Sequence, residues 1–385
     1  MKKRIFVIVL ALMMVLSAVG CQQAAAPAAP AAEPAAPAAE PAAPAAEPAA
    51  NTYEIALVTD VGNIDDKSFN QGAWEGVVAY AEANGKTYSY YRPSEDSTEA
   101  RVETIKAAVD KGAKVVVCPG YLFEDAIFEV QTAFPEVMFL LLDGEPHTAD
   151  YSSKETTANT HCILYQEEQA GYFAGYAAVK EGFTKLGFLG GMAVPAVIRY
   201  GYGFVQGAND AAKELGNAAD VEIKYWYADS FAPSDDIMTK MSGWYTEGTE
   251  VVFSCGGGIY LSAVAAAEAA NAKVIGVDVD QSAESELIIT SAMKGLTNSV
   301  VLALTDLYNN GGTWPAELSG KTSNLGAADD CVGLPTAEGS WRMSNFTVDQ
   351  YNTLFEQVKS GAVAVSNNSD PETHPVVDVA VEYMN

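Results

Sequence analysis

Basic residues are scarce in this chain. Among its 385 residues, 22 are lysine or arginine and 50 are aspartate or glutamate, which gives a formal net charge of −28 at pH 7. A chain with this charge repels the phosphate backbone of nucleic acids and the head groups of anionic lipids. We therefore expect neither a nucleic-acid partner nor a broad electrostatic contact with a membrane.

Histidine, cysteine and the common catalytic motifs are also scarce or absent. The chain has three histidines and five cysteines, and their spacings match no metal-binding or redox motif. There is no G-x-S-x-G elbow, no H-E-x-x-H and no Walker loop. The segment "GYGFVQG", Gly201 to Gly207, lacks the spacing of a dinucleotide fingerprint, so we expect a tightly packed helix start there. The sequence predicts a binding protein without a cofactor or metal rather than an enzyme.

The first twenty residues have the features of a secretory signal. Basic residues 2–4 precede an apolar stretch from Ile5 to Leu16, which is too short for a comfortable membrane span. Small residues then lead to Cys21 in a pattern that resembles a bacterial lipobox. We expect cleavage after Gly20 and lipid on Cys21, because two acyl chains give the stable anchoring that one chain lacks. Ordinary signal cleavage beside an incidental cysteine is the alternative.

The next segment is a tether. Residues 24–50 repeat alanine, proline and glutamate with a period of seven, as in "APAAEPA". Each proline removes a backbone donor and favours an extended chain, so this segment forms neither a helix nor a core. We expect residues 21–52 to hold the folded part, which starts near Tyr53, away from the membrane.

From Tyr53 onward, short apolar runs alternate with segments of helical spacing. The runs are "YEIALVTD", "KTYSYYR", "AKVVVCPG", "VMFLLLDG", "KLGFLGG", "VEIKYWYA", "EVVFSCGGG" and "KVIGVDVD". Continuous apolar strands that alternate with helices are typical of parallel sheets covered on both faces. The chain is also too long for one ordinary core. We predict an α/β protein with two similar four-stranded lobes, and place the first changeover near residues 159–163.

Several of these runs end in an aspartate or a glycine. In open α/β sheets, ligands bind beyond the carboxyl ends of the strands, where helix N-termini also point. Two lobes that face each other by these edges would form a polar cleft. The residues concerned are Asp60, Gly120, Asp143, Gly190, Gly256 and Asp278.

The segment "DDKSFNQGAWEG" places a phenylalanine at this edge. Ser68 and Gln71 have the spacing of a capping box, so Phe69 falls in the first turn of a helix that follows the strand ending in Asp60. The ring either staples the helix to its loop or offers an aromatic face to a ligand. Local signals leave both interpretations open.

Five segments together resemble the basic membrane protein family, also called PnrA-like lipoproteins. They are "VTDVGNIDDKSFNQGAWEG", "VPAVIRYGYGFVQGA", "VVFSCGGG", "VIGVDVDQ" and "ITSAMK". The family consists of substrate-binding components of ABC importers, many of them for purine nucleosides. The resemblance implies the type I periplasmic-binding-protein fold, with two Rossmann-like lobes of parallel sheets joined by three hinge crossovers. It implies one lobe of residues 53–160 plus 291–313 and another of residues 161–290 plus 314–385.

The resemblance also implies contacts for the base of a nucleoside. Phe69 in "DDKSFNQ" would stack on one face of the purine, and Phe231 in "YADSFAPSDD" would stack on the other. Asp60 and Asn70 would address the edge of the base.

Further contacts would hold the ribose. Asp278 in "GVDVDQ" and Lys294 in "ITSAMK" would bind its hydroxyls, and Gly257 would allow close approach of the backbone. Asp143, at the end of "FLLLD", is another expected polar contact. Vicinal hydroxyls suit this pair, because they donate to a carboxylate and accept from an ammonium group.

We therefore expect a monomeric lipoprotein that binds a purine nucleoside and works with the permease and ATPase subunits of an ABC importer. It would be lipid-anchored on the extracytoplasmic face of the cell membrane, with no cofactor. Two other classes stay open. One is a binding protein of the same fold for a sugar or another small polar ligand. The other is an enzyme, or a surface lipoprotein with an adhesin or sensing role.

Overall fold

The computed structural model describes residues 52–60 and 62–384. The expected signal peptide, Cys21 and nearly all of the tether fall in residues 1–51 and so lie outside the described residues. No helix among the described residues is long and apolar enough to cross a membrane.

The first sheet has six strands, all paired in parallel, in the order β11-β5-β4-β3-β1-β2. The strands are β1 (Ile55–Val58), β2 (Tyr88–Tyr91), β3 (Val115–Pro119), β4 (Met138–Leu142), β5 (Thr160–Tyr165) and β11 (Lys321–Leu325). Every residue of β1, β3 and β4 is buried, because helices cover both faces of the sheet.

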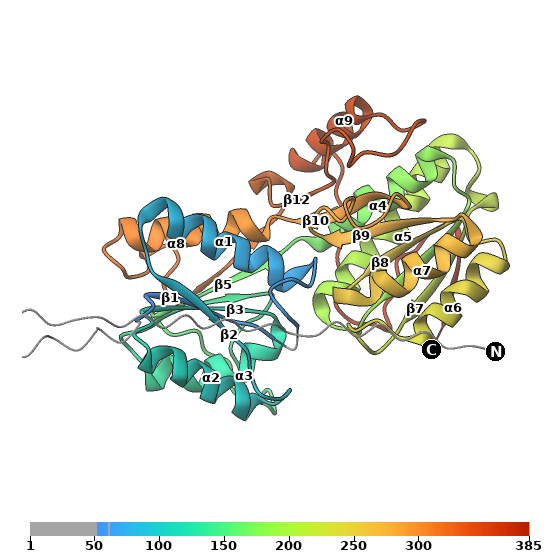
Figure 1. Ribbon diagram of the computed structural model, residues 1–385. Coiled ribbons are helices and arrows are strands. Elements are labelled where there is room, and N and C mark those ends of the chain that lie inside the picture. Colours follow the sequence, from blue (N-terminus) through green and yellow to red (C-terminus); the bar gives the residue numbers. More distant parts are fainter. Residues whose placement is uncertain (1–51, 61, 385) are drawn as a thin grey trace, which may run out of the picture. The chain divides into compact units, whose positions relative to one another are not determined.

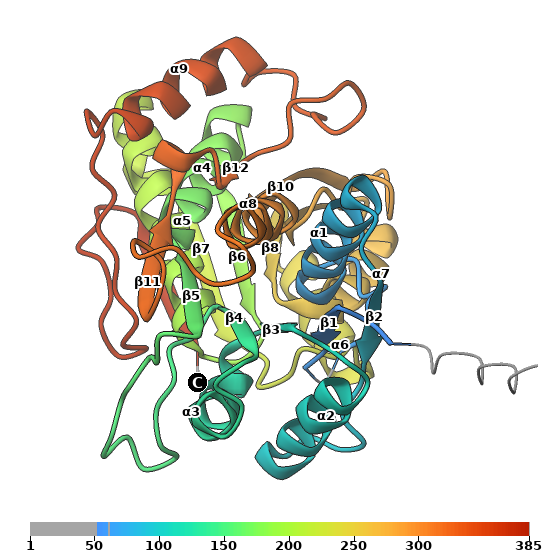
Figure 2. The same ribbon diagram turned by 90° about the vertical axis from the view of Figure 1, so that its left-hand side faces the viewer.

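Four helices cover this sheet. Helices α2 (Thr98–Asp110) and α3 (Glu124–Ala133), the latter preceded by the short helix η1 (Tyr121–Phe123), lie on one face (Figure 1). Helices α1 (Phe69–Asn84) and α8 (Leu296–Asn309) lie side by side on the other (Figure 2). Helix α8 therefore covers the first sheet although it follows a strand of the second.

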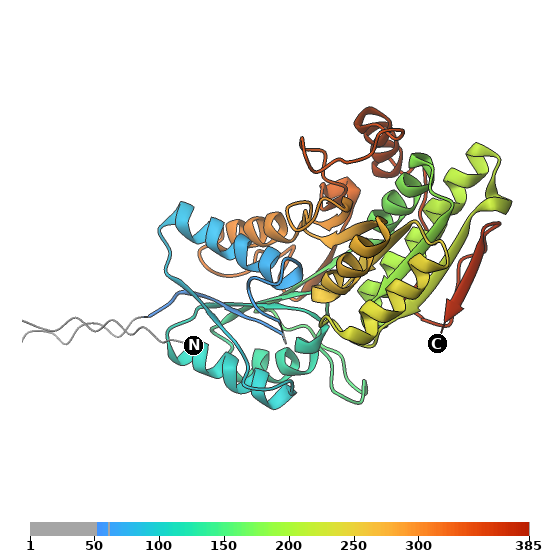
Figure 3. The same cartoon turned by 45° about the vertical axis from the view of Figure 1, so that its right-hand side comes forward.

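The second sheet has seven strands, in the order β12-β10-β9-β8-β6-β7-β13. They are β6 (Lys185–Gly190), β7 (Glu222–Tyr227), β8 (Val251–Cys255), β9 (Lys273–Asp278), β10 (Ile288–Lys294), β12 (Val332–Gly333) and β13 (Ala380–Met384). All neighbours are parallel except β10 and β12. Strand β13, at the red C-terminal end of the chain, forms one edge of the sheet (Figure 3).

Helices cover both faces of the second sheet as well. Helices α4 (Glu167–Glu181) and α5 (Pro195–Leu215) pack on one face, and α6 (Asp235–Thr246) and α7 (Tyr260–Ala270) on the other (Figure 1). Helix α9 (Val348–Lys359) packs near α4. The chain also forms the short helices η2 (Ala218–Asp220), η3 (Gly257–Ile259) and η4 (Ala327–Asp329).

All eight apolar runs predicted as strands are strands, β1–β4 and β6–β9, but the sheets are larger than predicted and the lobe boundaries need correction. The whole of β5 pairs in the first sheet, β10 stays in the second sheet up to Lys294, and β11 returns to the first. The chain thus passes between the sheets at Gln166, Gly295 and Gly326, not at residues 160, 291 and 313.

Strand β11, "KTSNL", is a polar edge strand. An edge strand needs no continuous apolar run, so the apolar pattern did not reveal it.

The three crossovers lie beside one another. The Gln166 N–H donates to the carbonyl oxygen of Leu325 at 2.9 Å, and the Gly295 N–H donates to that of Cys331 at 2.7 Å. The predicted three-crossover connection is thus present, with each passing segment hydrogen-bonded to another.

Helices α4 and α5 touch through their backbones. A Cβ atom built on any of four glycines would lie 1.9–2.0 Å from a carbonyl oxygen of the partner helix. The glycines are Gly171 and Gly175 of α4 and Gly203 and Gly207 of α5. The expectation of tight packing around "GYGFVQG" is correct, but the segment lies inside α5, which begins at Pro195.

Candidate ligand-binding cleft

A cavity of about 700 Å³ lies where the carboxyl ends of strands from both sheets meet. Five of the six strand-end residues singled out from the sequence line it, and Gly190 is not among the lining residues. All eight residues predicted to contact a ligand line this one cavity. They are Asp60, Phe69, Asn70, Asp143, Phe231, Gly257, Asp278 and Lys294. Their role as ligand contacts stays a prediction.

The start of α1 differs from the predicted capping box. Ser68 precedes the helix, but its hydroxyl makes no cap; it donates to Asp278 Oδ2 at 2.5 Å. Asp66 caps the helix in its place, because its two carboxylate oxygens accept hydrogen bonds from the backbone N–H groups of Ser68, Asn70 and Gln71 at 2.9–3.0 Å. A carboxylate satisfies several N–H groups at once, and this leaves the serine hydroxyl free to reach the second lobe.

Asp60 and Asn70 form a fixed pair at the end of β1. Asp60 Oδ1 accepts hydrogen bonds from the backbone N–H of Gly62 at 2.7 Å and from Asn70 Nδ2 at 2.8 Å. Asn70 Oδ1 accepts from the backbone N–H of Asp60 at 3.3 Å. Burial raises the pKa of Asp60, against the effect of these two donors.

The two phenylalanines come from different lobes. Phe69 is partly buried, and the ammonium nitrogen of Lys294 lies 4.8 Å from the centre of its ring. The Phe231 ring packs directly against glycine backbone, because Cβ atoms on Gly191 and Gly256 would approach it to 2.4 and 2.8 Å. The glycine run 256–258 was expected to let the protein backbone approach a ligand closely, and it also makes room for the Phe231 ring. The Gly258 N–H donates to the Phe231 carbonyl oxygen at 2.8 Å.

Lys294 is buried within a network of charges. Its ammonium group contacts the Asp143 carboxylate and lies 3.1 Å from Glu167 Oε1. Burial opposes the charge of Lys294, yet the two carboxylates outweigh burial and raise its pKa. Burial raises the pKa of Asp143, and Lys294 opposes that rise. The pair joins the end of β4 to the end of β10, and so spans the two sheets.

Glu167 and Arg199 complete this network and were missed by the sequence analysis. The Arg199 Nε–H donates to Glu167 Oε2 at 2.6 Å, and the Glu167 side chain is fully buried. Although burial opposes it, Arg199 and Lys294 hold the pKa of Glu167 below its usual value. A glutamate in a first helical turn and an arginine inside a helix are common on surfaces, so the sequence carried no signal for this buried pair.

Asp143 and Asp278 occupy equivalent places in the two sheets. Asp143 directly follows β4 and Asp278 is the last residue of β9, and each of these strands is the fourth along the chain in its sheet among the predicted strands. The φ angle is positive at both residues, 59° at Asp143 and 65° at Asp278. Aspartate tolerates this left-handed conformation better than most residues, but it is still uncommon there. Strained residues gather at functional sites, and here they turn both carboxylates into the cavity.

A family model described as "ABC transporter substrate-binding protein PnrA-like" matches residues 54–368. The chain belongs to this PnrA-like family. Among its relatives, the ABC transporter nucleoside-binding protein BmpA of Lactococcus lactis is 29% identical over 239 residues, which cover 59% of this chain and 64% of that protein. The match to that relative thus spans less than two thirds of its length. Basic membrane protein B of Borreliella burgdorferi is 29% identical over 303 residues, or 74% of this chain and 81% of that protein.

A solved structure of the same fold supports the architecture. The solute-binding protein of an ABC transporter system from Aeropyrum pernix superposes with a TM-score of 0.70 at 21% identity, over 83% of this chain and 94% of that one. The predicted family and the predicted type I periplasmic-binding fold are confirmed. The family model describes its members as substrate-binding proteins of ABC transporters.

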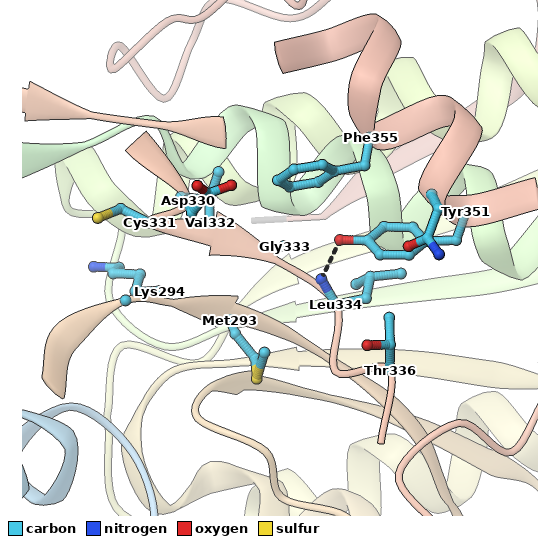
Figure 4. A pocket seen from close by; sticks show the side chains of 12 residues that line it. Met293, Lys294, Asp330, Cys331, Val332, Gly333, Leu334, Thr336, Tyr351 and Phe355 are labelled. Carbon is cyan, nitrogen blue, oxygen red and sulfur yellow. Dashed lines mark hydrogen bonds between the residues drawn. The ribbon is translucent and has the colours of Figure 1, made fainter. Parts of the chain in front are cut away.

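This PnrA-like chain has a second, smaller cavity of about 270 Å³ beside the crossovers (Figure 4). Residues from the end of β10, from β12 and from α9 line it, and the Tyr351 hydroxyl there accepts a hydrogen bond from the Leu334 N–H at 2.7 Å. Within the described residues, no lining side chain is among the buried polar atoms without a hydrogen-bond partner. We assign this cavity no ligand.

The four cysteines of the described residues are buried free thiols that form no disulfide. They are Cys118, Cys162, Cys255 and Cys331. Burial raises the pKa of the Cys118 thiol well above its usual value, as expected for a cysteine that packs as a small hydrophobic residue. No group of three or more histidine, cysteine, aspartate or glutamate side chains in residues 52–60 and 62–384 could hold a metal ion.

Proposed function

We propose that this PnrA-like protein is a lipid-anchored binding protein on the extracytoplasmic face of the membrane. It takes a purine nucleoside into the cleft and delivers it to the permease and ATPase subunits of an ABC importer. It performs no reaction on that nucleoside. The observation that carries the proposal is the pair of phenylalanines, one from each lobe, beside a carboxylate and an ammonium group in one cavity.

The aromatic pair favours a flat ligand. Phe69 lies at the start of α1 and Phe231 follows β7, so the two rings reach the cavity from opposite sheets. Stacking of a nucleic-acid base on an aromatic side chain contributes about 1–3 kcal/mol by alanine substitution. A sugar gains less from two such rings, because it has no π-face.

The polar end of the cavity favours a ribose. Asp278 accepts a hydrogen bond from Ser68 in this structure, and Lys294 holds its charge beside Asp143. A ribose has neighbouring hydroxyls, each of which donates and accepts, so it can replace the Ser68 hydroxyl at Asp278 while accepting from Lys294.

The charge of the cavity favours a neutral ligand over a nucleotide. Six carboxylates line the cavity, and among the described residues only one cation does, Lys294, which is already paired. The carboxylates are Asp60, Asp66, Asp96, Asp143, Asp229 and Asp278. A phosphate in this setting would meet like charges at close range, which is unfavourable. The name of the Lactococcus lactis relative, a nucleoside-binding protein, agrees with this proposal.

The lobes of the proposed closing motion follow the strand pairing. We take residues 53–165 plus 296–325 as one lobe and residues 166–295 plus 326–384 as the other, with the three crossovers as the hinge. Closure would press the base between the rings and bury the ribose.

The test is direct identification of the ligand. The full-length protein is purified under native conditions, and the small molecules released on denaturation are identified by mass spectrometry. Calorimetry then compares a panel of nucleosides with nucleoside monophosphates and free sugars. We expect a purine nucleoside to be released and to bind. Binding of a sugar with no binding of any nucleoside would overturn the proposal.

A further inference from the structure

Resting on the proposed function, we infer that the cleft selects among purine nucleosides by the hydrogen at N1 of the base. Guanosine and inosine carry this hydrogen, and adenosine has a lone pair in its place. The inference follows from which polar atoms at the base edge are free and which are already bonded to the protein.

Asn70 has no donor left for a ligand. Its Nδ2 carries two hydrogens, and these go to Asp60 Oδ1 at 2.8 Å and to Asp66 Oδ2 at 2.9 Å. The orientation of the amide is set by its neighbours, because the reverse orientation would point its oxygen at two carboxylates. Asn70 therefore positions Asp60 instead of addressing the base as a donor, which changes the role expected for it from the sequence.

Asp60 has one free oxygen. Its Oδ1 accepts from Gly62 and from Asn70, which fills both lone-pair positions. Its Oδ2 accepts no hydrogen bond from the described residues, and Asp60 lines the cavity. The group that this corner offers to a base is thus an acceptor.

The free oxygen of Asp60 and the ring of Phe69 border the same open space beside Gly120. A Cβ atom built on Gly120 would lie 3.7 Å from Asp60 Oδ2 and 3.7 Å from Cε1 of Phe69. Gly120 has a φ of 114°, a conformation that side-chain-bearing residues rarely adopt, so this space stays open. A base stacked on Phe69 brings its edge to this space, within reach of Asp60 Oδ2.

The chemistry of the base edge then decides the preference. Guanine presents two donors side by side, N1–H and an N2–H, and a single carboxylate oxygen with two free lone-pair positions can accept both. Hypoxanthine presents N1–H alone. Adenine presents the N1 lone pair, which the carboxylate repels, and one donor at N6. The expected order of affinity is guanosine, then inosine, then adenosine.

The first arm of the test uses the unmodified full-length protein and changes only the ligand. Calorimetry compares guanosine, inosine, adenosine and 1-methylguanosine, in which a methyl group replaces the N1 hydrogen. Because hydrogen bonds to a charged group are worth more than neutral ones, guanosine should bind roughly tenfold or more tightly than adenosine. The methylated nucleoside should lose at least this advantage.

The second arm changes the carboxylate. Asp60→Asn keeps the shape. Its amide oxygen takes the place of Oδ1, where Gly62 and Asn70 already donate, so its NH2 group faces the base and donates to N1 of adenine. The preference for guanosine over adenosine should therefore shrink or reverse. Asp229→Asn is the matched control: it removes the same charge from the same cavity at an exposed residue with a φ of 53°, which asparagine also tolerates. Its ratio of affinities should equal that of the parent.

The outcomes separate this inference from the proposed function. Equal binding of guanosine and adenosine by the unmodified protein, or full binding of 1-methylguanosine, would overturn the inference and leave nucleoside binding intact. Absence of binding by every nucleoside would overturn both. If Asp60→Asn does not fold, as melting will show, the ligand series decides alone.

Discussion

Removal of the Phe69 ring separates the stacking role from the staple role. The ring lines the cavity and is only partly buried, with Lys294 near its centre. Loss of one base-stacking ring costs about 1–3 kcal/mol of binding free energy. Phe69→Ala should therefore raise the dissociation constant of a purine nucleoside by roughly 5- to 150-fold.

The stability of the ligand-free variant should change little. A fully buried phenylalanine costs about 3–5 kcal/mol when it is truncated to alanine, because it leaves a cavity. Phe139, in β4 of the same lobe, is fully buried and provides the reference for such a loss. Phe69→Ala opens onto a cavity that already exists, so its loss of stability should be well below that of Phe139→Ala.

The assay is calorimetry and thermal melting on the same preparations of the parent, Phe69→Ala, Phe69→Trp and Phe139→Ala. Phe69→Trp should retain much of the affinity, since a base needs only the ring face. The reasoning is refuted if Phe69→Ala melts early, like a core truncation, and yet binds purine nucleosides with the affinity of the parent.

Four further predictions address the anchor, the motion, the ribose and the helix pair. Cys21→Ser should release the protein from membranes and abolish lipid labelling; retention of that variant in the membrane fraction would contradict the lipid anchor. Small-angle scattering should give a smaller radius of gyration with a saturating nucleoside than without it, and identical profiles would argue against closure. Asp278→Ala should weaken nucleosides by about 1–3 kcal/mol and leave free bases unaffected, whereas equal losses for both would make Asp278 structural. Gly203→Val should strongly lower the melting temperature, because the new Cβ would lie 1.9 Å from a carbonyl oxygen of α4. Gly243→Ala in α6 has open space around it and should leave the melting temperature nearly unchanged. Similar melting temperatures for the two variants would refute the backbone contact.

The buried strands could be predicted because their residues are apolar throughout. Strands β1, β3, β4 and β8 are buried at every position, so each appears in the sequence as a continuous run. The edge strand β11 gave no such signal: it contains Thr322, Ser323 and Asn324, since only one side of it pairs. The third lobe boundary was misplaced because β11 went unrecognised, whereas the other two were placed at the start of β5 and inside β10, before these strands end.

The lining of the cleft could be predicted, but the bonds within it could not. Strand ends and the family motifs pointed to the right residues, because topology brings strand ends together. Whether Ser68 caps its own helix or bonds Asp278 depends on a residue 210 positions away, and a local motif carries no information about it. The same holds for Asn70, whose amide is occupied by two carboxylates.

The excess of carboxylates around the cavity has a consequence for the cell. Purines outside a cell are released largely from nucleic acids and nucleotides, which carry phosphate esters. If the proposed function holds, a cleft lined by six carboxylates and one paired cation repels the phosphate group of such compounds and does not bind them. Hydrolysis of the phosphate ester must then come first, outside the membrane, and the protein binds only the nucleoside that this step releases. Its uptake would be limited by phosphatase activity in the surroundings as much as by its own affinity.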